Sequence, residues 1–396
     1  MPVDKHLRAA LDGTPLAGKP TGIGAFCAGL LAALARRPDL DVGAFAISRR
    51  GRADLDGKLP EGVRPLGPRG RNVPARVLHS SWRIWPFPPA ELWTGGAGVV
   101  HGTNFVVPPA WRAATVVTVH DLTPLRYPNW CLPAARAYPE LVRRAVARGA
   151  WVHADSEFVA DEVRSLLRVP AERVRAIYPG IPPVPDPTAA EPPEETGSPS
   201  GALRALLPPS VTSYVLALGT VEPRKGFPDL VKAFGRIAGR HPGLALVIAG
   251  PDGWATHELS RAVGASSSPE RVVRLGWVST AQRDSLLRGA TVFAYPSLYE
   301  GFGLPPLEAM AAGTAVVASD IAALREVLGD AALLVPAGDG EALTGALDHL
   351  IGDDAAREAL VSKGRQRAAL FTWERCAEQM ERLYRDAIQG DVPGGG

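Results

Sequence analysis

The chain has 396 residues, more than one ordinary hydrophobic core holds, and its length predicts two domains. Its 43 basic and 41 acidic residues leave a formal charge of +2, so no large field is present to attract nucleic acid. The three cysteines, Cys27, Cys131 and Cys376, are far apart and form no paired motif, so neither a disulfide framework nor a structural zinc site is indicated.

The N-terminus contains no continuous apolar core of signal-peptide length. The longest apolar run, residues 25–35, is too short to span a bilayer. We therefore expect a cytoplasmic protein, and peripheral contact with the inner face of the membrane stays open.

The N-terminal half alternates strand-like and helix-like patterns. Strands are predicted at 7–11, 98–101, 114–120, 151–154 and 174–178, and helices at 25–36, 134–149 and 157–167. Such alternation is typical of a parallel sheet with helices on both faces. It predicts an α/β, doubly wound, Rossmann-like domain over residues 1–182.

Two glycines, Gly22 and Gly24, precede the helix expected at 25–36. Glycines at a helix start let the backbone approach an anion, although a plain flexible turn fits them equally well. The Asp39-Leu-Asp41 and Asp54-Leu-Asp56 segments resemble a D-x-D metal motif, but they lie beside turns and not at the end of a buried strand. We predict no metal site.

Polar residues follow two strands of this half. His101 ends the strand at 98–101 and is followed by Thr103 and Asn104, and His120 ends the strand at 114–120 and is followed by Asp121. Ligands of open α/β sheets bind at the carboxyl ends of strands, so these five residues are candidates for an acceptor site. For His101, an internally hydrogen-bonded histidine is an equally good interpretation.

Residues 69–93 interleave arginines with tryptophans, including Trp82 and Arg83. Such residues suit a sugar, an anionic acceptor or a lipid headgroup layer. Tryptophan rings packed beneath a loop are the more common arrangement, and this interpretation is favoured. If the segment holds a ligand, we expect the ligand to be the acceptor.

Residues 183–209 are rich in Pro, Glu, Ser and Gly and are predicted to be an interdomain linker. A second α/β series follows over 210–370, with strands at 214–219 and 244–249 and a helix at 228–240. The loop between its first strand and first helix contains Arg224 and Lys225. These two cations suit a diphosphate, which accepts one bidentate and one point-charge contact.

The stretch 291–319 reads as strand, loop, helix and strand. Two prolines place a helix start near Leu304, and Gly313 suits its C-terminal end. Gly301 and Gly303 precede this start, where amides and the helix N-terminus favour an anion. Glu300 and Glu308 flank the turn, so one carboxylate is placed to meet a sugar and the other a ribose.

These segments resemble motifs of the retaining GT-B glycosyltransferases with an E-x7-E motif, the large family four, group one family. The resemblance lies in Glu300-Gly-Phe-Gly-Leu-Pro-Pro-Leu-Glu308, in Glu222-Pro-Arg-Lys-Gly226 and in His120-Asp-Leu122. It implies two Rossmann-like domains facing across a cleft, with the acceptor side in 1–182 and the donor side in 210–370. It also implies that a helix at 371–390 crosses back to the first domain; the tail 391–396 is expected to be disordered.

The same resemblance implies that a hexosyl unit passes from a nucleoside diphosphate sugar to an acceptor hydroxyl with retention and without metal. The donor is expected to be GDP-mannose-like or a UDP- or dTDP-sugar, and the acceptor a glycan, a lipid-linked sugar or a small molecule. The catalytic candidates are His120, Arg224, Lys225 and Glu300. The donor-binding candidates are Gly22, Gly24, Gly219, Arg224, Lys225, Val278, Glu300, Gly301, Phe302, Gly303, Leu304 and Glu308.

Three other functions stay open at this stage. A sugar-nucleotide epimerase or a phosphorylase shares the two-domain architecture. A glycosidase would use Glu300 and Glu308 as acid and nucleophile. A non-catalytic nucleotide-sugar binding protein would need the same donor residues.

Overall fold

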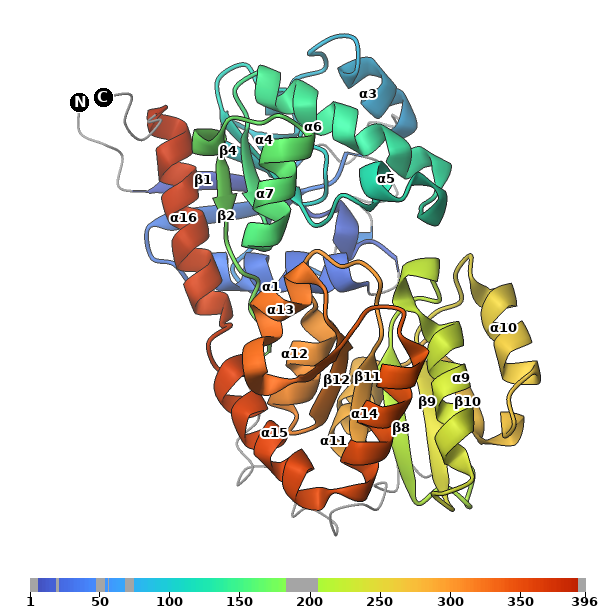
Figure 1. The fold of residues 1–396 in the computed structure, drawn as a ribbon. Coiled ribbons are helices and arrows are strands. Elements are labelled where there is room, and N and C mark those ends of the chain that lie inside the picture. The colour runs from blue at the N-terminus through green and yellow to red at the C-terminus, as the bar shows by residue number, and fades with distance from the viewer. Residues whose placement is uncertain are drawn as a thin grey trace. The chain divides into compact units, whose positions relative to one another are not determined.

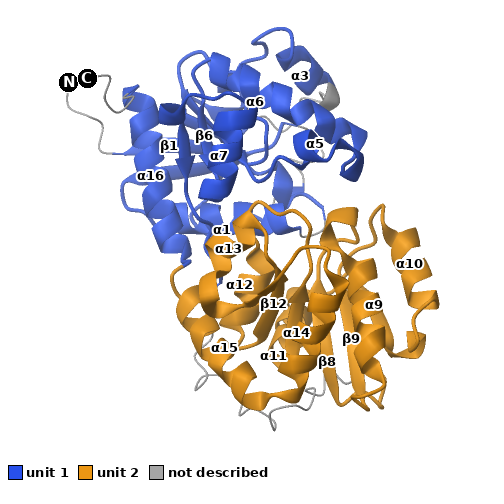
Figure 2. Ribbon diagram, viewed as in Figure 1, with its two compact units in different colours: residues 1–182, 371–396 blue, residues 183–370 orange. Residues whose placement is uncertain are grey.

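The chain folds into two compact units (Figure 2). Unit 1 comprises Met1–Pro182 with Phe371–Gly396, and unit 2 comprises Pro183–Leu370. The computed structural model describes residues 6–18, 21–47, 54–55, 57–67, 75–182 and 206–390. Most of the expected linker, residues 183–205, and the tail 391–396 lie outside these ranges.

Unit 1 contains a seven-stranded, wholly parallel sheet with the strand order β3-β2-β1-β4-β5-β6-β7 (Figure 1). Its strands are β1 Leu7–Asp12, β2 Leu40–Phe45, β3 Arg64–Pro65, β4 Val99–Gly102, β5 Ala114–Val119, β6 Trp151–Ala154 and β7 Val174–Ala176. The central strands are buried, as expected for a parallel sheet covered on both faces. The order reverses direction between the neighbours β1 and β4, which makes their carboxyl ends the ligand-binding edge of this unit.

Helices of unit 1 connect these strands. They are α1 Gly22–Ala35, α3 Ala75–Trp82, α4 Glu91–Thr94, α5 Thr123–Arg126, α6 Tyr138–Ala147, α7 Glu157–Leu166 and α16 Trp373–Gln389. Ser156 caps α7 through its side chain, which accepts from the amide of Val159.

Helix α1 begins three residues earlier than predicted. Thr21 is its N-cap, and the Thr21 side chain accepts a hydrogen bond from the amide of Gly24. Gly22 and Gly24 therefore lie inside the first helical turn and not in a loop before it. The expectation that both precede the helix was wrong, because an N-cap threonine starts the helix despite two poor helix formers.

Helix α16, at the C-terminal end of the described chain, packs in unit 1 against α1. The Thr372 side chain caps it by accepting from the amide of Arg375. A Cβ on Gly29 of α1 would lie only 2.2 Å from the indole of Trp373, so glycine at this position allows the close approach of the two helices.

Unit 2 repeats the architecture with a six-stranded parallel sheet of order β10-β9-β8-β11-β12-β13. Its strands are β8 Ser213–Leu218, β9 Leu244–Ala249, β10 Val272–Gly276, β11 Val292–Tyr295, β12 Ala315–Ser319 and β13 Leu333–Val335. The order reverses between the hydrogen-bonded neighbours β8 and β11, which pair at Val292 with Val215. The ligand-binding edge of unit 2 therefore follows these two strands.

Helices on both sides of this sheet complete unit 2 (Figure 1). They are α9 Phe227–Ala238, α10 Thr256–Gly264, α11 Thr280–Gly289, α12 Leu304–Ala311, α13 Ala322–Leu328, α14 Gly340–Gly352 and α15 Asp354–Ala368. The predicted start of α12 at Leu304 is confirmed, and Gly313 follows its end with a left-handed φ of 84°. In the described parts of the chain, no helix is long and apolar enough to cross a membrane.

A buried hydrogen-bond chain ties α16 to the sheet of unit 1. The Tyr384 hydroxyl lies 2.7 Å from His101 Nδ1, and His101 Nε2 lies 2.7 Å from the Thr118 hydroxyl. That hydroxyl lies 2.9 Å from His153 Nδ1, and His153 Nε2 lies 2.9 Å from the carbonyl of Ile177. Because a carbonyl only accepts, His153 donates from Nε2. Burial lowers the pKa of His153 and so favours its neutral form, in which Nδ1 accepts from Thr118 and each earlier donor follows in turn.

Both histidines of this chain are therefore neutral. Burial lowers the pKa of His101 well below its usual value, and the neighbouring His153 and His120 lower it further. The candidate acceptor residue His101 is thus corrected to a structural histidine: it is fully buried, and both of its ring nitrogens are already hydrogen-bonded.

We expect Tyr384→Phe to weaken the attachment of α16. The substitution leaves the buried Nδ1 of His101 without a donor, which costs about 1–3 kcal/mol. Hydrogen exchange of the α16 amides should accelerate accordingly. Tyr214→Phe is the matched control, because it removes a buried hydroxyl bound to Leu286 in unit 2; equal exchange of α16 in both variants would contradict the expectation.

Candidate functional site

The two cationic residues of unit 2 lie at its ligand-binding edge. Arg224 and Lys225 belong to the short 3-10 helix Pro223–Lys225 that follows β8, and Glu300 belongs to the loop that follows β11. The amide of Leu298 donates to the carbonyl of Arg224 at 2.7 Å and joins the two loops. At Gly226, which has a φ of 65°, a Cβ would lie 2.3 Å from the carbonyl oxygen of Pro296, so this approach needs glycine.

Both cations bind the same carboxylate. Arg224 Nη1 donates to Glu300 Oε2 at 2.6 Å, and Lys225 Nζ donates to Glu300 Oε1 at 2.6 Å. Lys225 also donates to the Tyr295 hydroxyl at 2.8 Å, and Arg224 Nε donates to Glu222 Oε2 at 2.7 Å. We call these five residues, Glu222, Arg224, Lys225, Tyr295 and Glu300, the Glu300 cluster.

The two cations of the Glu300 cluster favour the ionised form of the Glu300 carboxyl group. Burial alone raises the pKa of Glu300, but Arg224 and Lys225 outweigh it and lower that pKa to about 2. Burial and the adjacent Arg224 lower the pKa of Lys225, and Glu300 opposes this change. A buried ammonium therefore depends on the Glu300 carboxylate for its charge.

The Gly301–Leu304 turn leads directly into α12. Gly303 has a left-handed φ of 111°, and a Cβ there would lie 2.6 Å from Leu324. No side chain caps the helix. Since Pro305 and Pro306 carry no N–H, only Leu304 and Leu307 supply amides in the first four positions, so the anion site expected here has fewer donors than an ordinary helix start.

Glu308 has a cationic partner that the sequence did not reveal. Its carboxylate lies 3.2 Å from Arg283 Nη1 of α11, and its side chain is 12% exposed. Burial raises the pKa of Glu308, and Arg283 offsets part of this rise. Glu300 and Glu308 therefore occupy opposite electrostatic environments.

The remaining donor-side candidates line the same end of the sheet. Gly219 follows β8, and a Cβ there would lie 3.3 Å from Lys225 Cε. Phe302 is buried. Val278 is half-buried and follows β10, immediately before the Ser279 capping box of α11.

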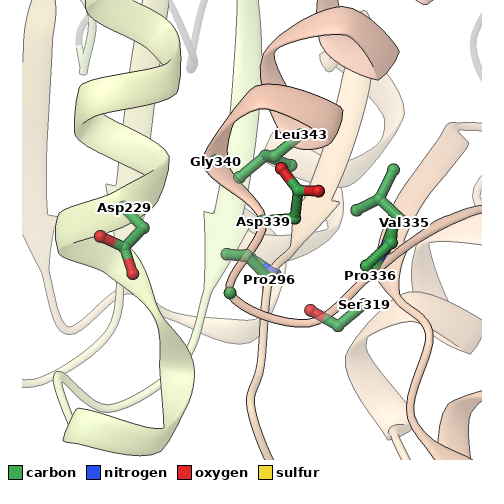
Figure 3. Close-up of a pocket in the computed structure, with 9 residues that line it drawn as sticks. Asp229, Pro296, Ser319, Val335, Pro336, Asp339, Gly340 and Leu343 are labelled. Carbon is green, nitrogen blue, oxygen red and sulfur yellow. The ribbon is translucent and has the colours of Figure 1, made fainter.

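A small pocket lies beyond the ends of β11, β12 and β13 (Figure 3). It contains none of the Glu300 cluster. Its volume is about 10 Å³, at the lower limit for one water molecule. Asp339, on its rim, already accepts from the amides of Glu341 and Ala342, so we assign no ligand to it.

In unit 1, His120 directly follows β5, and 11% of its side chain is exposed. His120 Nδ1 lies 2.6 Å from Asp155 Oδ2, and Nε2 lies 2.9 Å from the carbonyl oxygen of Thr103. Burial lowers the pKa of His120, but Asp155 and the Thr103 carbonyl raise it more, so the net shift is upward.

The other acceptor candidates divide into internal and accessible residues. Thr103 is corrected to an internal residue, because its buried hydroxyl donates to the carbonyl of Asp12 at 2.6 Å. Trp82 is likewise corrected: it is buried and its indole N–H donates to the Pro88 carbonyl at 3.1 Å, which is the core packing favoured from the sequence. Arg83 is exposed and Asn104 is partly exposed. Asp121 accepts from the amide of Thr123 at 2.9 Å.

Gly24 is also corrected, because its amide already donates to the Thr21 hydroxyl at 3.1 Å, within the first turn of α1. Gly22 stays exposed with open space around it. In the described part of the chain, no group of three or more His, Cys, Asp or Glu residues could hold a metal ion.

Asp155 was missed by the sequence analysis, as were Asp12 and Arg283. The rule that selected His120, a polar residue at the carboxyl end of a buried strand, would have found Asp12 at the end of β1 and Asp155 directly after β6. Arg283 lies within a helix, where no such rule applies.

Two doubly wound units, with the motifs at the strand-order reversal, define the GT-B class of fold. The solved structure of Anabaena HepE in complex with UDP-glucose matches 96% of this chain and 100% of that chain, with a TM-score of 0.69 at 20% identity. The predicted fold class is thereby confirmed.

Sequence comparisons define the family. The model for Glycosyltransferase Family 4 matches residues 20–184, and the model for Glycosyl transferases group 1 matches residues 204–367. An alpha-maltose-1-phosphate synthase from Mycolicibacterium smegmatis is 33% identical over 333 residues, 78% of this chain and 79% of that protein. O-antigen chain mannosyltransferase B from Escherichia coli is 29% identical over 317 residues, 78% of each chain. The chain belongs to the family 4, group 1 glycosyltransferases.

We expect stability to depend on the charge of Glu300. Between pH 4.5 and about 2 the unfolded chain binds a proton at this residue that the folded chain does not, so the free energy of unfolding falls as the pH drops. The Glu300→Gln variant should not show this fall in the free energy of unfolding. At pH 7 it should be less stable by about 3–5 kcal/mol, because Lys225 stays buried without its carboxylate.

Urea unfolding from pH 7 to pH 2.5, followed by a probe in unit 2, measures both effects. Glu341→Gln is the matched control, because Glu341 is exposed on α14. A Glu300→Gln variant whose stability declines below pH 4.5 as steeply as that of the unmodified chain would contradict the assignment.

Proposed function

We propose that this glycosyltransferase moves a hexosyl unit from a nucleoside diphosphate sugar to an acceptor hydroxyl with retention of configuration and without metal. The observation that carries the proposal is the convergence of Arg224 and Lys225 on Glu300 at the strand-order reversal of unit 2. HepE, a structural neighbour, was solved with UDP-glucose, and one relative is a mannosyltransferase; both names support a sugar-nucleotide donor.

In this proposal the bond between the sugar C1 and the diphosphate oxygen breaks, and a bond from C1 to the acceptor oxygen forms. The hydroxyl proton passes to an oxygen of the departing diphosphate. Negative charge therefore grows on the diphosphate in the transition state. Arg224 and Lys225 stabilise this charge, as fixed cations do in other preorganised sites.

Glu300 holds these cations in place before the donor arrives. It is ionised and bound by two cations, which makes it a poor proton donor and a poor nucleophile. This observation favours transfer over the glycosidase alternative. Glu308 and the segment around Val278 are proposed to contact the ribose and the base.

The acceptor is proposed only as a class: a glycan, a lipid-linked sugar or a small molecule. Ile84, Trp85 and Phe87 form an exposed apolar segment between α3 and α4 of unit 1, with exposed fractions of 75%, 69% and 56%. Together with the exposed Arg83, this segment supports an acceptor, or a membrane surface, that presents apolar groups.

Nucleoside diphosphates should stabilise the protein directly. Thermal-shift measurements with GDP, UDP and dTDP, each with a metal chelator, test the donor and the absence of a metal requirement together. A nucleotide at a hundredfold its dissociation constant stabilises the folded chain by about 2.7 kcal/mol. No shift with any of the three would contradict the proposal, and a shift abolished by the chelator would contradict its metal-independent part.

Lys225→Ala should lower turnover far more than donor affinity. If its charge acts mainly in the transition state, kcat should fall by about 10²-fold or more while the donor KM changes little. Lys232→Ala is the matched control, because Lys232 lies on α9 with 65% of its side chain exposed. Thermal melting should show that both variants are folded. Equal kcat values in the two variants would then contradict the role proposed for Lys225.

Product analysis separates the remaining alternatives. Incubation with sugar nucleotides and no acceptor yields an isomerised sugar if the enzyme is an epimerase. Release of a sugar phosphate in the presence of inorganic phosphate identifies a phosphorylase. A transferase gives a glycosylated acceptor whose anomeric configuration shows retention or inversion.

A further inference from the structure

The ring of His120 lies between two groups that accept hydrogen bonds. Asp155 Oδ2 is 2.6 Å from Nδ1, and the Thr103 carbonyl oxygen is 2.9 Å from Nε2. A neutral imidazole has one N–H, so either neutral tautomer would set a nitrogen lone pair against an oxygen lone pair. Only a ring protonated on both nitrogens satisfies both contacts while Asp155 is ionised.

A proton placed on Asp155 instead would also satisfy this geometry. Imidazole is the stronger base, with an ordinary pKa of about 6.5 against about 3.9 for an aspartic acid. The shared proton therefore belongs to His120, and the pair is an imidazolium with a carboxylate.

The other oxygen of Asp155, Oδ1, is buried and has no hydrogen-bond partner among the described residues, so the carboxylate depends on His120 for its counter-charge. His153 Nε2 lies 3.8 Å from it, which is beyond hydrogen-bond distance. Removing the proton from His120 would leave a buried carboxylate with no cation bound to it, which is strongly unfavourable.

The surroundings of His120 contain both charged and neutral groups. Asp155 on the β6 side and Asp121 on its own segment favour its charged form, and the rings of Phe26 and Phe105 pack beside it at 5.1 and 6.1 Å. His101 of β4 and His153 of β6 lie close enough for the charge of His120 to lower their pKa values. Burial and the charge of Asp155 both raise the pKa of Cys376 on α16.

His120 thus differs from its two histidine neighbours. The hydrogen-bond chain from Tyr384 to Ile177 gives His101 and His153 one proton each, whereas the contacts of His120 require two. These three rings provide an internal comparison within one buried region.

We propose that Asp155 is a positioning residue that keeps His120 as an imidazolium at neutral pH, at the ligand-binding edge of unit 1. In that state His120 cannot act as a general base, and both of its N–H groups are used within the protein. It acts on a ligand through its charge and favours an anionic group at the end of β5. The kinetic part of this inference rests on the proposed transfer function.

The protonation state can be measured without activity. In the full chain labelled with 15N-histidine, NMR titration from pH 5 to 9 should show His120 protonated on both nitrogens at pH 7. His101 and His153 should carry one proton each. His120→Gln removes one pair of ring-nitrogen resonances, from Nδ1 and Nε2, and thereby assigns that pair to His120.

Asp155→Asn tests the cause. Loss of an opposite charge within hydrogen-bond distance should lower the pKa of His120 by about one unit or more. Asp121→Asn is the matched control, because it removes a nearby carboxylate that makes no hydrogen bond to the ring, and it should lower that pKa much less. A singly protonated His120 at pH 7, or equal pKa values of His120 in the two variants, would overturn the proposal.

The pH profile of transfer supplies a readout that a structural role alone would not move. Activity should decline on the alkaline side as His120 loses its proton, and Asp155→Asn should move this decline to lower pH by about one unit or more. A folded Asp155→Asn enzyme with an unmoved profile overturns the positioning role. Absence of transfer with every sugar nucleotide refutes the proposed function instead, and the NMR titration still decides the state of His120.

Discussion

One buried carboxylate organises the candidate site of unit 2. Glu300 accepts from Arg224 and Lys225, and it thereby joins the loop after β8 to the loop after β11. These strands are neighbours in the sheet although 73 residues lie between Leu218, where β8 ends, and Val292, where β11 begins. Without the carboxylate, a buried ammonium would have no counter-charge, so the loop geometry and the charge state depend on each other.

This arrangement makes the Glu300 cluster nearly neutral as it stands. Two cations, Arg224 and Lys225, face two carboxylates, Glu222 and Glu300, so a diphosphate does not meet a large excess of positive charge. It meets cations whose positions are already set. Preorganised charges of this kind need little rearrangement when negative charge develops on a leaving group, and this feature makes them effective in catalysis.

The buried histidines of unit 1 are satisfied in two ways, by neutral hydrogen bonds and by an ion pair. His101 and His153 are satisfied within a chain of neutral hydrogen bonds that attaches α16 to the sheet. His120 is paired with an ionised acid at the edge where strands end. The sequence did not distinguish these cases, since His101 and His120 were both predicted to end apolar strands. The partners Tyr384 and Asp155, which decide the outcome, lie 283 and 35 residues away.

The sequence alone determined the alternation of strands and helices, the start of α12 and the two motifs at the ends of β8 and β11, because hydrophobic period, proline and glycine act locally. It also placed Arg224, Lys225 and Glu300 among the site candidates. Only the tertiary structure decided that these three residues share one ion-pair cluster, that Arg283 pairs with Glu308, and that Thr103, Trp82 and His101 point inward. Those outcomes depend on which strands lie side by side and which side chains burial brings together, and no local pattern in the chain specifies either.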